Sequence, residues 1–278
     1  MNKSKIVVIF TCFNRREKTI TCMRSLVEKN RNAEFCFIVV DDNSTDGTGA
    51  AIHALNYDVH YLMGTGSLYW AGGMRKGIGY FLNEPCFQNW DYVALVNDDV
   101  AFFDESLDKM VEQSRRIPDA AIVGNCCNHK GEPTYGATKF YKNKMRKIYY
   151  HLGIQNAHVC ADSFNCNCVL FPAEMIRKLG NFDECYTHSF ADYDYGVSVR
   201  RNGFGIYGTD FFVGACDKEG HDGAWQDPTL PMRVRLKKKE HPKGLPFREY
   251  YHFLRKNLGL GWALRYAFTP YIRILLKK

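Results

Sequence analysis

The first half of the chain alternates between short apolar runs and segments in which apolar residues recur at helical spacing. Continuous apolar runs, typical of buried parallel strands, occupy residues 5–13, 35–40, 59–63, 91–96 and 120–123. The spacing between the runs predicts helices over 15–28, 71–82 and 104–116, and a short helix after residue 47. Strands that alternate with helices in this way predict an α/β fold with a mostly parallel sheet flanked by helices.

Two acidic pairs follow predicted strands. Asp41-Asp42 closes the second strand, and Asn97-Asp98-Asp99 closes the fourth. Ligands of parallel α/β sheets bind beyond the carboxyl ends of the strands. Taken alone, the first pair is better explained as an Asx-turn, because Asp-Asn-Ser-Thr-Asp-Gly is ordinary turn chemistry. The second pair favours a functional role.

Glycine-rich phosphate-binding motifs are missing from this pattern. Tyr69 stands where the third glycine of a dinucleotide fingerprint beginning at Gly64-Thr65-Gly66 would be, and the first strand leads into Phe13-Asn14-Arg15. A nucleotide diphosphate would therefore need a metal ion. Asp98-Asp99 suits Mg²⁺ or Mn²⁺, which take carboxylate oxygens together with substrate phosphates.

Length and composition are those of an ordinary globular protein. The 278 residues, 46% hydrophobic and 24% charged, suffice for one large domain or two small ones. Neither an 18-residue apolar segment nor a signal-peptide core is present, so we expect a cytoplasmic protein without a transmembrane helix. The eleven cysteines are an odd number and read best as reduced thiols. A zinc site at His158, Cys160, Cys166 and Cys168 is the weaker alternative to buried, hydrophobe-like cysteines.

Charge divides the chain into an acidic body and a basic tail. Residues 233–278 hold 13 Lys and Arg and two acidic residues, a formal charge of +11, which leaves the other 232 residues at −4. Residues 247–258 have the spacing of an amphipathic helix, and 258–276 are mostly apolar but include Arg265 and Arg273. We expect this tail to contact an anionic membrane surface. Packing on the body, or a homodimer interface, is the alternative, and nucleic acid is not an expected partner.

Four motifs in order over residues 5–205 resemble family 2 glycosyltransferases with the GT-A fold. They are Phe13-Asn14-Arg15 with Val39–Thr48, then Gly72-Gly73 with Arg75, then Asn97-Asp98-Asp99, and finally Phe190–Asp194 with the helix that follows. The resemblance implies a GT-A-like domain over 1–232, followed by the helical tail over 233–278.

The resemblance also implies roles for individual residues. Asp192 is expected to be the general base, although the acidic residue that usually precedes it is replaced by Ala191. Asp192 then either acts without that neighbour or shares the role with Asp194. Asp99 is expected to bind the metal ion, and Asp98 the ribose or the ion. His221, in a glycine-flanked loop, is a candidate further metal ligand. The expected nucleotide-sugar-binding residues are Thr11, Phe13, Asn14, Arg15, Asp41, Asp42, Gly73, Arg75, Asn97 and Asp98.

The function implied is that of a metal-dependent, inverting hexosyltransferase of the bacterial surface-polysaccharide type. Its donor would be a UDP- or dTDP-sugar, its acceptor a glycan or a lipid-linked glycan, and its place the inner face of the cell membrane. Two alternatives remain open. One is a sugar-nucleotide nucleotidyltransferase, which needs a glycine-rich amino-terminal loop that Phe13-Asn14-Arg15 does not supply. The other is a non-catalytic glycan-binding relative, which Ala191 keeps open.

Overall fold

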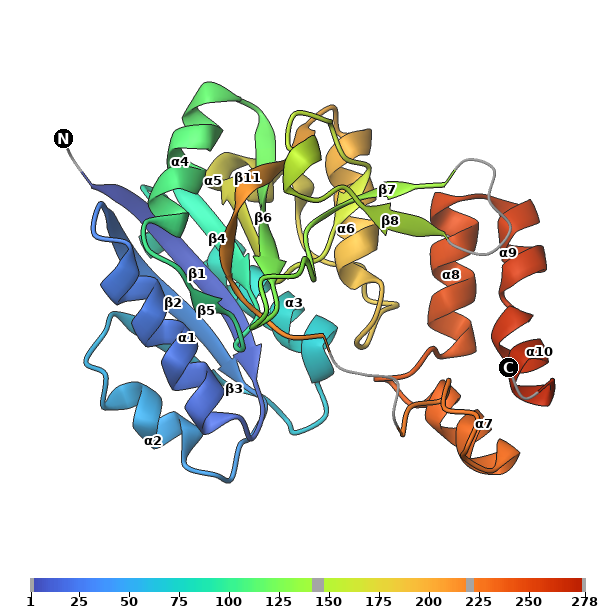
Figure 1. The fold of residues 1–278 in the computed structure, drawn as a ribbon. Helices are drawn as coiled ribbons and strands as arrows, with labels where there is room; N and C mark the ends of the chain where they lie inside the picture. Colours follow the sequence, from blue (N-terminus) through green and yellow to red (C-terminus); the bar gives the residue numbers. More distant parts are fainter. Residues whose placement is uncertain (1–2, 142–147, 219–222, 277–278) are drawn as a thin grey trace.

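A central eight-stranded sheet organises the protein (Figure 1). The computed structural model describes residues 3–141, 148–218 and 223–276. The strands lie in the order β3-β2-β1-β4-β10-β6-β11-β5. Their bounds are β1 Ser4–Cys12, β2 Ala33–Asp41, β3 Val59–Met63, β4 Tyr92–Val96, β5 Ala101–Phe102, β6 Ala120–Cys127, β10 Cys168–Pro172 and β11 Gly205–Ala215.

The four strands at one side of the sheet are parallel, as the apolar runs predict. β1 pairs in parallel with both β2 and β4, and β2 with β3. β10 is inserted antiparallel between β4 and β6, and the short β5 pairs antiparallel with β11. The mixed α/β architecture is therefore confirmed. The insertion of β10 was not predicted, because a strand's local pattern carries no information about its partner.

Helices cover both faces of the sheet and bury a separate apolar core on each. One face is covered by α1 Arg16–Lys29, α2 Thr48–His53 and α4 Ser106–Arg116. The other is covered by α3 Tyr69–Asn83, α5 Ala173–Leu179 and α6 Ala191–Arg201. The eleven cysteines are free thiols, and Cys166 and Cys168 are buried in different cores, as expected for small hydrophobes.

A small antiparallel sheet lies beside α6. Its order is β8-β7-β9. The bounds are β7 Ala137–Phe140, β8 Tyr149–His151 and β9 Ser163–Phe164, and the short 3₁₀ helices are η1 Pro85–Phe87 and η2 Ile154–Asn156. These short elements were not predicted.

The described residues of the basic tail form four helices, of which α8 stands beside α6 and α9 and α10 lie beyond α8 (Figure 1). They are α7 Met232–Glu240, α8 Phe247–Asn257, α9 Leu260–Tyr266 and α10 Thr269–Leu275. The predicted amphipathic helix is thus α8, and its residues Tyr250, Phe253 and Leu254 are buried in the core that α3 and α6 share. Within the described ranges, every helix is too short or too polar to cross a bilayer.

Candidate functional site

The carboxyl ends of three adjacent strands bring the predicted site residues together. β2, β1 and β4 are neighbours in the sheet and parallel, so the segments that leave them emerge at one edge. These segments contain Thr11–Arg15, Asp41–Asp42 and Asn97–Asp99. This is the edge at which parallel α/β sheets bind ligands.

Arg15 joins both carboxylates of the second acidic pair. Its Nη1 donates to Asp98 Oδ1 at 2.9 Å, and its Nη2 donates to Asp99 Oδ2 at 3.0 Å. Arg15 is the last residue of the loop between β1 and α1, so it can reach the segment that follows the neighbouring strand β4. The two carboxylates thus converge on one cation.

The carboxylate of Asp98 is buried, which has an electrostatic consequence. Burial disfavours its charged form and raises its pKa to about 6, although Arg15 opposes the shift. Thr19 Oγ1 donates to Asp98 Oδ2 at 3.1 Å, and Cys216 Sγ donates to Asp99 Oδ1 at 3.4 Å. Neither Thr19 nor Cys216 was predicted, since a lone Thr in a helix and a lone Cys carry no motif.

Asp41 forms the Asx-turn that its sequence predicts, and it also joins β2 to β3. Its Oδ1 accepts a hydrogen bond from the Ser44 amide at 2.7 Å. Its Oδ2 accepts one from the Tyr61 hydroxyl at 2.6 Å. The side chain is fully buried, so these contacts fix the start of the turn after β2.

Asp42 holds the loop between β3 and α3. Its Oδ1 accepts from the Gly66 amide at 2.8 Å, and its Oδ2 accepts from the amides of Leu68 and Tyr69 at 2.8 and 3.1 Å. A Cβ atom on Gly64 would lie only 2.5 Å from Asp42 Oδ1, so the loop requires glycine there. Asp42 therefore fixes the loop beside the candidate site at this edge of the sheet, which is formed by residues 11–15, 41–42 and 97–99 and is called the edge site below.

Asn14 ties the loop after β1 to the loop after β2. Its backbone has a left-handed φ of 51°, a conformation that Asn tolerates better than most residues. Its backbone amide donates to Ser44 Oγ at 2.9 Å, and its side-chain Oδ1 accepts from the backbone amide of Thr45 at 2.7 Å. Phe13, one residue earlier, is left exposed.

Thr11 and Gly73 make the close approach of α3 to β1. Thr11 Oγ1 donates to the Val40 carbonyl at 2.9 Å. A Cβ atom on Gly73 would lie 2.2 Å from Thr11 Oγ1, so only glycine allows this packing. The structure gives both predicted ligand-binding residues a packing role.

Trp70 connects α3 to the strand end that carries the acidic pair. Its Nε1 donates to Asn97 Oδ1 at 2.8 Å, and its amide donates to His188 Nδ1 at 3.4 Å. Burial, together with the positive charges of Lys243 and His241, lowers the pKa of His188 to about 4. His188 is therefore neutral at physiological pH. It was not predicted, because a single His in a loop has no distinguishing spacing.

Asp192 lies in the first turn of α6, which follows the left-handed Phe190. Its Oδ1 accepts from the Tyr193 amide at 2.8 Å, and its Oδ2 accepts from the Cys166 amide at 3.4 Å. Burial raises its pKa to about 6, against these hydrogen bonds, which lower it. A carboxylate with this pKa can accept a proton near neutral pH.

One short segment before β10 links Asp192 to the acidic pair. The backbone amide of Cys166 contacts Asp192, and the backbone amide of Asn97 donates to the backbone carbonyl of Asn167 at 3.0 Å. Asn167 Nδ2 also contacts Cys216 Sγ at 3.4 Å, and that sulfur contacts Asp99. Residues far apart in the sequence therefore border one site.

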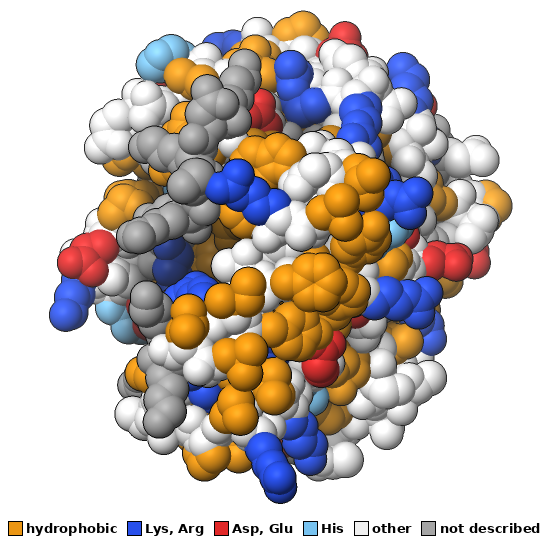
Figure 2. All heavy atoms as spheres, turned by 90° about the vertical axis from the view of Figure 1, so that its right-hand side faces the viewer, with side chains coloured by type: hydrophobic (Ala, Val, Ile, Leu, Met, Phe, Trp, Pro, Cys, Tyr) orange, Lys and Arg blue, Asp and Glu red, His pale blue; other side chains and the backbone are white. Residues whose placement is uncertain are grey.

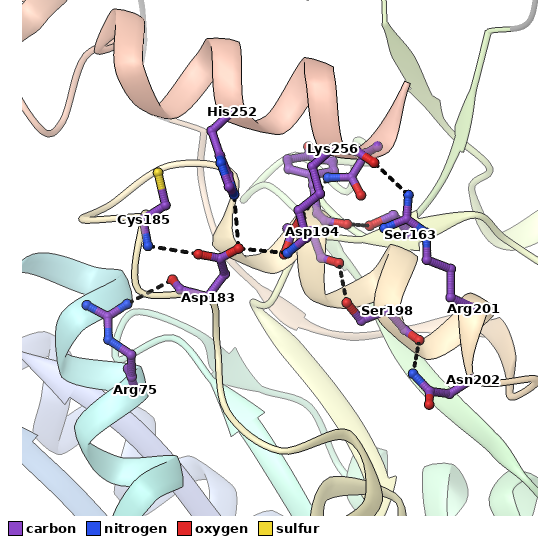
Figure 3. Close-up of polar contacts among 12 residues, drawn as sticks. Arg75, Ser163, Asp183, Cys185, Asp194, Ser198, Arg201, Asn202, His252 and Lys256 are labelled. Atoms are coloured by element: carbon purple, nitrogen blue, oxygen red, sulfur yellow. Dashed lines mark hydrogen bonds and ion pairs between the residues drawn. The ribbon is translucent and has the colours of Figure 1, made fainter. Parts of the chain in front are cut away.

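Asp194 belongs to a separate set of contacts between α6 and the tail (Figure 3). Its Oδ2 pairs with Lys256 Nζ at 2.7 Å, and its Oδ1 accepts from Asn257 Nδ2 at 2.7 Å. Lys256 Nζ also pairs with Asp183 Oδ2 at 2.7 Å, and His252 Nε2 lies 3.0 Å from the same oxygen. These contacts tie Asp194 of α6 to residues of α8. Asp192 is therefore the acid of this motif that borders the edge site.

Arg75 points toward the loop before α6 (Figure 3). Its Nη1 donates to the carbonyls of Asp183 and Tyr186, both at 3.1 Å. The predicted donor-binding arginine therefore supports the loop that leads to Asp192. His221, the candidate further metal ligand, lies outside the described residues.

Comparisons with known proteins agree with this geometry. A family model described as Glycosyl transferase family 2 matches residues 7–168, which include both acidic pairs. No curated protein matches the sequence significantly. Many solved structures share the fold, and two of them, both at low sequence identity, are described below; at such identity they show the GT-A architecture alone.

The first is a mannosyltransferase, PcManGT from Pyrobaculum calidifontis, solved with GDP-Man and Mn²⁺. It has 16% identity and a TM-score of 0.57, and the match covers 99% of this chain and 76% of that one. The second is S. aureus TarS 1-349 solved with UDP-GlcNAc. It has 15% identity and a TM-score of 0.59, and the match covers 98% of this chain and 81% of that one.

Proposed function

Since this chain belongs to glycosyl transferase family 2 and is a glycosyltransferase, we propose that it moves a hexose with inversion from a nucleotide-diphosphate sugar to an acceptor hydroxyl. The observation that carries the proposal is the convergence of Asp98 and Asp99 on a cation, at the edge that Asp192 also borders. The family match argues against the nucleotidyltransferase alternative.

The acidic pair fits a divalent ion, Mn²⁺ or Mg²⁺. The guanidinium of Arg15 already stands as a cation between the two carboxylates, within 3.0 Å of each. Asp99, together with Asp98, would hold the ion, and carboxylate oxygens are the ligands that these hard cations prefer. When bound, such an ion neutralises the negative charge that gathers on a departing diphosphate.

Arg15 has a second part in this proposal. The guanidinium and an ion would compete for the same carboxylate oxygens, so Arg15 has to release them when the ion binds. A freed guanidinium at the end of β1 can pair with phosphate oxygens, for which its planar donors are suited. Arg15 would thus exchange a protein carboxylate partner for the donor's diphosphate.

Asp192 is proposed as the general base that takes the proton of the acceptor hydroxyl. With its pKa raised to about 6, it is mostly ionised at neutral pH and still basic enough to accept a proton. Ala191 removes the usual acidic neighbour, and Asp194 is engaged by Lys256 and Asn257. Asp192 therefore acts without a second carboxylate.

The donor's base and ribose are proposed to lie against the loops after β1 and β2. Asp41, Asp42 and the exposed Phe13 border this region. A UDP- or dTDP-sugar is the proposed donor. TarS was solved with UDP-GlcNAc, which supports a uridine donor, whereas PcManGT was solved with GDP-Man, so GDP-sugars also belong in the test.

We further propose that residues 1–232 carry the transfer and that residues 233–278 attach the enzyme to an anionic membrane surface. An apolar stripe runs along α9 and α10, and Figure 2 shows hydrophobic side chains gathered on the side of the molecule that these helices form. The stripe consists of residues that are each more than half exposed: Leu260, Leu264, Phe268, Ile272 and Leu275. Their steps of three or four place them on one side of the helices. Ala263, Ala267 and Ile274, on the other side, are buried.

Charge favours a membrane over a second copy of the chain as the partner of this stripe. The tail carries a formal charge of +11, and the exposed Arg265 and Arg273 follow stripe residues. Anionic headgroups attract such a surface. A symmetric dimer through the stripe would bring two +11 tails together. We therefore propose that the enzyme works at the inner face of the cell membrane and that its acceptor is a glycan or a lipid-linked glycan.

The transfer is tested by measuring nucleotide diphosphate release from UDP-, dTDP- and GDP-sugars with Mn²⁺ or Mg²⁺. We expect slow donor hydrolysis with one class of donor, which EDTA abolishes and added Mn²⁺ restores. Asp99→Asn should lose this activity and keep its fold. Release that persists undiminished in excess EDTA would contradict the metal role, and no release from any donor would contradict the transferase proposal.

A further inference from the structure

Three metal-ligating side chains converge on the sheet face that α3 covers. In the parallel pair of β2 and β3, Ile38 lies beside His60. Since alternate residues of a strand share a face, Cys36 of β2 points to the same side as Ile38, and Asp58 directly precedes β3. The Cys36 sulfur, an Asp58 carboxylate oxygen and a His60 ring nitrogen all lie within 4.8 Å of one another.

The imidazole ring of His60 is held in place by neighbouring aromatic residues. Its Nδ1 lies 3.0 Å from the Tyr80 hydroxyl, and its ring packs against Tyr80 and Phe87 at centroid distances of 5.5 and 5.0 Å. Metal-binding histidines usually have such a hydrogen bond to one ring nitrogen, which orients the ring and leaves the other nitrogen for the metal.

Burial changes across the cluster from the core to the surface. Cys36 is buried, His60 is half-buried and Asp58 is exposed, so the cluster is closed by protein on one side and open to solvent on the other. Burial, followed by Asp58, raises the pKa of the Cys36 thiol well above its usual range, so the sulfur is protonated without an ion. An ion that binds there forms a bond to sulfur and releases the thiol proton to solvent.

We infer that Cys36, Asp58 and His60 form a second metal site, separate from the Asp98-Asp99 pair, that takes Zn²⁺. One thiolate, one imidazole and one carboxylate are ligands that zinc accepts in tetrahedral sites, whereas Mg²⁺ and Mn²⁺ favour oxygen. Cys86 of η1 directly precedes Phe87, whose ring packs on His60, so Cys86 or water would supply the fourth ligand. The site would join β2, β3 and η1 at the sheet edge.

This site lies away from the transfer chemistry. Cys36 is five residues before Asp41, which is about 16 Å along an extended strand. Bound zinc would therefore act on the stability of the β2–β3 edge, and the inference does not depend on the proposed transfer.

Cobalt substitution tests the site without any sugar donor. The full-length, metal-free, reduced protein is titrated with Co²⁺, and the sulfur-to-cobalt charge-transfer band in the near ultraviolet is recorded together with the visible bands of tetrahedral cobalt. We expect one equivalent of Co²⁺ to give both the charge-transfer band and the visible bands. Zn²⁺ should displace the Co²⁺ and raise the Tm of the protein. Cys36→Ser should abolish the charge-transfer band, and Asp58→Asn, at an exposed position, should weaken Co²⁺ binding at least tenfold.

Three controls separate this site from other ligands. Cys185→Ser removes a thiol elsewhere, and Asp99→Asn removes a carboxylate of the proposed transfer site, so both should keep the band. Cys86→Ser keeps the band if water is the fourth ligand and reduces its intensity if Cys86 is. If Cys36→Ser fails to fold, His60→Gln replaces it. A wild-type protein without a thiolate band, or a band that survives both Cys36→Ser and His60→Gln, overturns the inference.

Discussion

At the scale of single residues, the two acids near the start of α6 have different surroundings and hence different expected roles. Asp192 is held by backbone amides beside the edge site, whereas Asp194 pairs with Lys256 at 2.7 Å. Both are Asp, and they are two positions apart, so their helical positions differ by roughly 200°. The pair offers a matched comparison of a base with a structural acid.

We expect Asp192→Asn to lower turnover by two or more orders of magnitude and to leave nucleotide binding intact, because removal of a general base has an effect of this size. Asp194→Asn should keep most turnover but lower the free energy of unfolding by about 1–3 kcal/mol, since it weakens hydrogen bonds to a charged group. Steady-state kinetics and thermal unfolding of both variants check this. The reverse pattern, an inactive Asp194→Asn with a nearly normal Asp192→Asn, would assign the base to Asp194.

The pH profile tests the same carboxylates. Burial raises the pKa of both Asp98 and Asp192 to about 6, so each is protonated, and inactive as a ligand or base, below that pH. At saturating Mn²⁺ the ion keeps Asp98 ionised, and log kcat/KM should fall with a slope of one below about pH 6. At limiting Mn²⁺ the slope should approach two. A flat profile between pH 4.5 and 7 would exclude Asp192 as the base.

Arg15 is expected to compete with the metal ion. Arg15→Ala should bind Mn²⁺ about tenfold more tightly in the absence of donor, because the ion no longer has to break the two charge-assisted hydrogen bonds of Arg15. A tenfold change corresponds to a net gain of about 1.4 kcal/mol. The transfer rate of the variant should nevertheless fall, because the diphosphate loses a partner. Isothermal titration with Mn²⁺ measures the affinity, and weaker binding by Arg15→Ala would show that Arg15 organises the carboxylates instead.

At the scale of secondary-structure elements, α8 is part of the body and not a detachable appendage. Phe253 is fully buried and stacks on Phe190, the residue that precedes α6, at a centroid distance of 4.8 Å. Lys256 and His252 add polar contacts to the same region. A deletion of residues 246–278 would therefore expose core surface, so point substitutions test the tail more cleanly than truncation does.

Phe253→Ala should lower the free energy of unfolding by about 3–5 kcal/mol, as expected when a buried aromatic side chain is removed. Chemical denaturation with one transition reports this value. The matched variant Phe268→Ala, which removes an exposed phenylalanine of the stripe, should change it little. Equal effects of the two substitutions would show that the stripe is also covered in solution.

At the scale of the whole molecule, the basic tail presents an apolar stripe beside an acidic body. We expect Leu264→Glu with Ile272→Glu to abolish flotation with vesicles that contain anionic lipid, because both the apolar contact and the electrostatic attraction are weakened. Wild-type binding should decrease at high salt, which screens that attraction.

Sedimentation of the same proteins distinguishes a membrane from a second copy. A wild-type monomer that floats with anionic vesicles, and not with neutral ones, agrees with the membrane proposal. A dimer that the double substitution dissociates, without vesicle binding, would assign the stripe to a homodimer interface.

The sequence by itself determined the elements and the family. Apolar runs and helical spacing are local, so they predicted β1 to β4 and the helices between them, and the acidic pairs at strand ends indicated the site. Tertiary structure alone decided the contacts across the chain, such as Arg15 on Asp98 and Asp99 or Lys256 on Asp194. It also decided the insertion of β10 and the burial of one side of the tail while the other stays exposed. The physical reason is that such contacts depend on which elements pack together, and packing is set by the complementary surfaces of distant segments and not by the pattern within one.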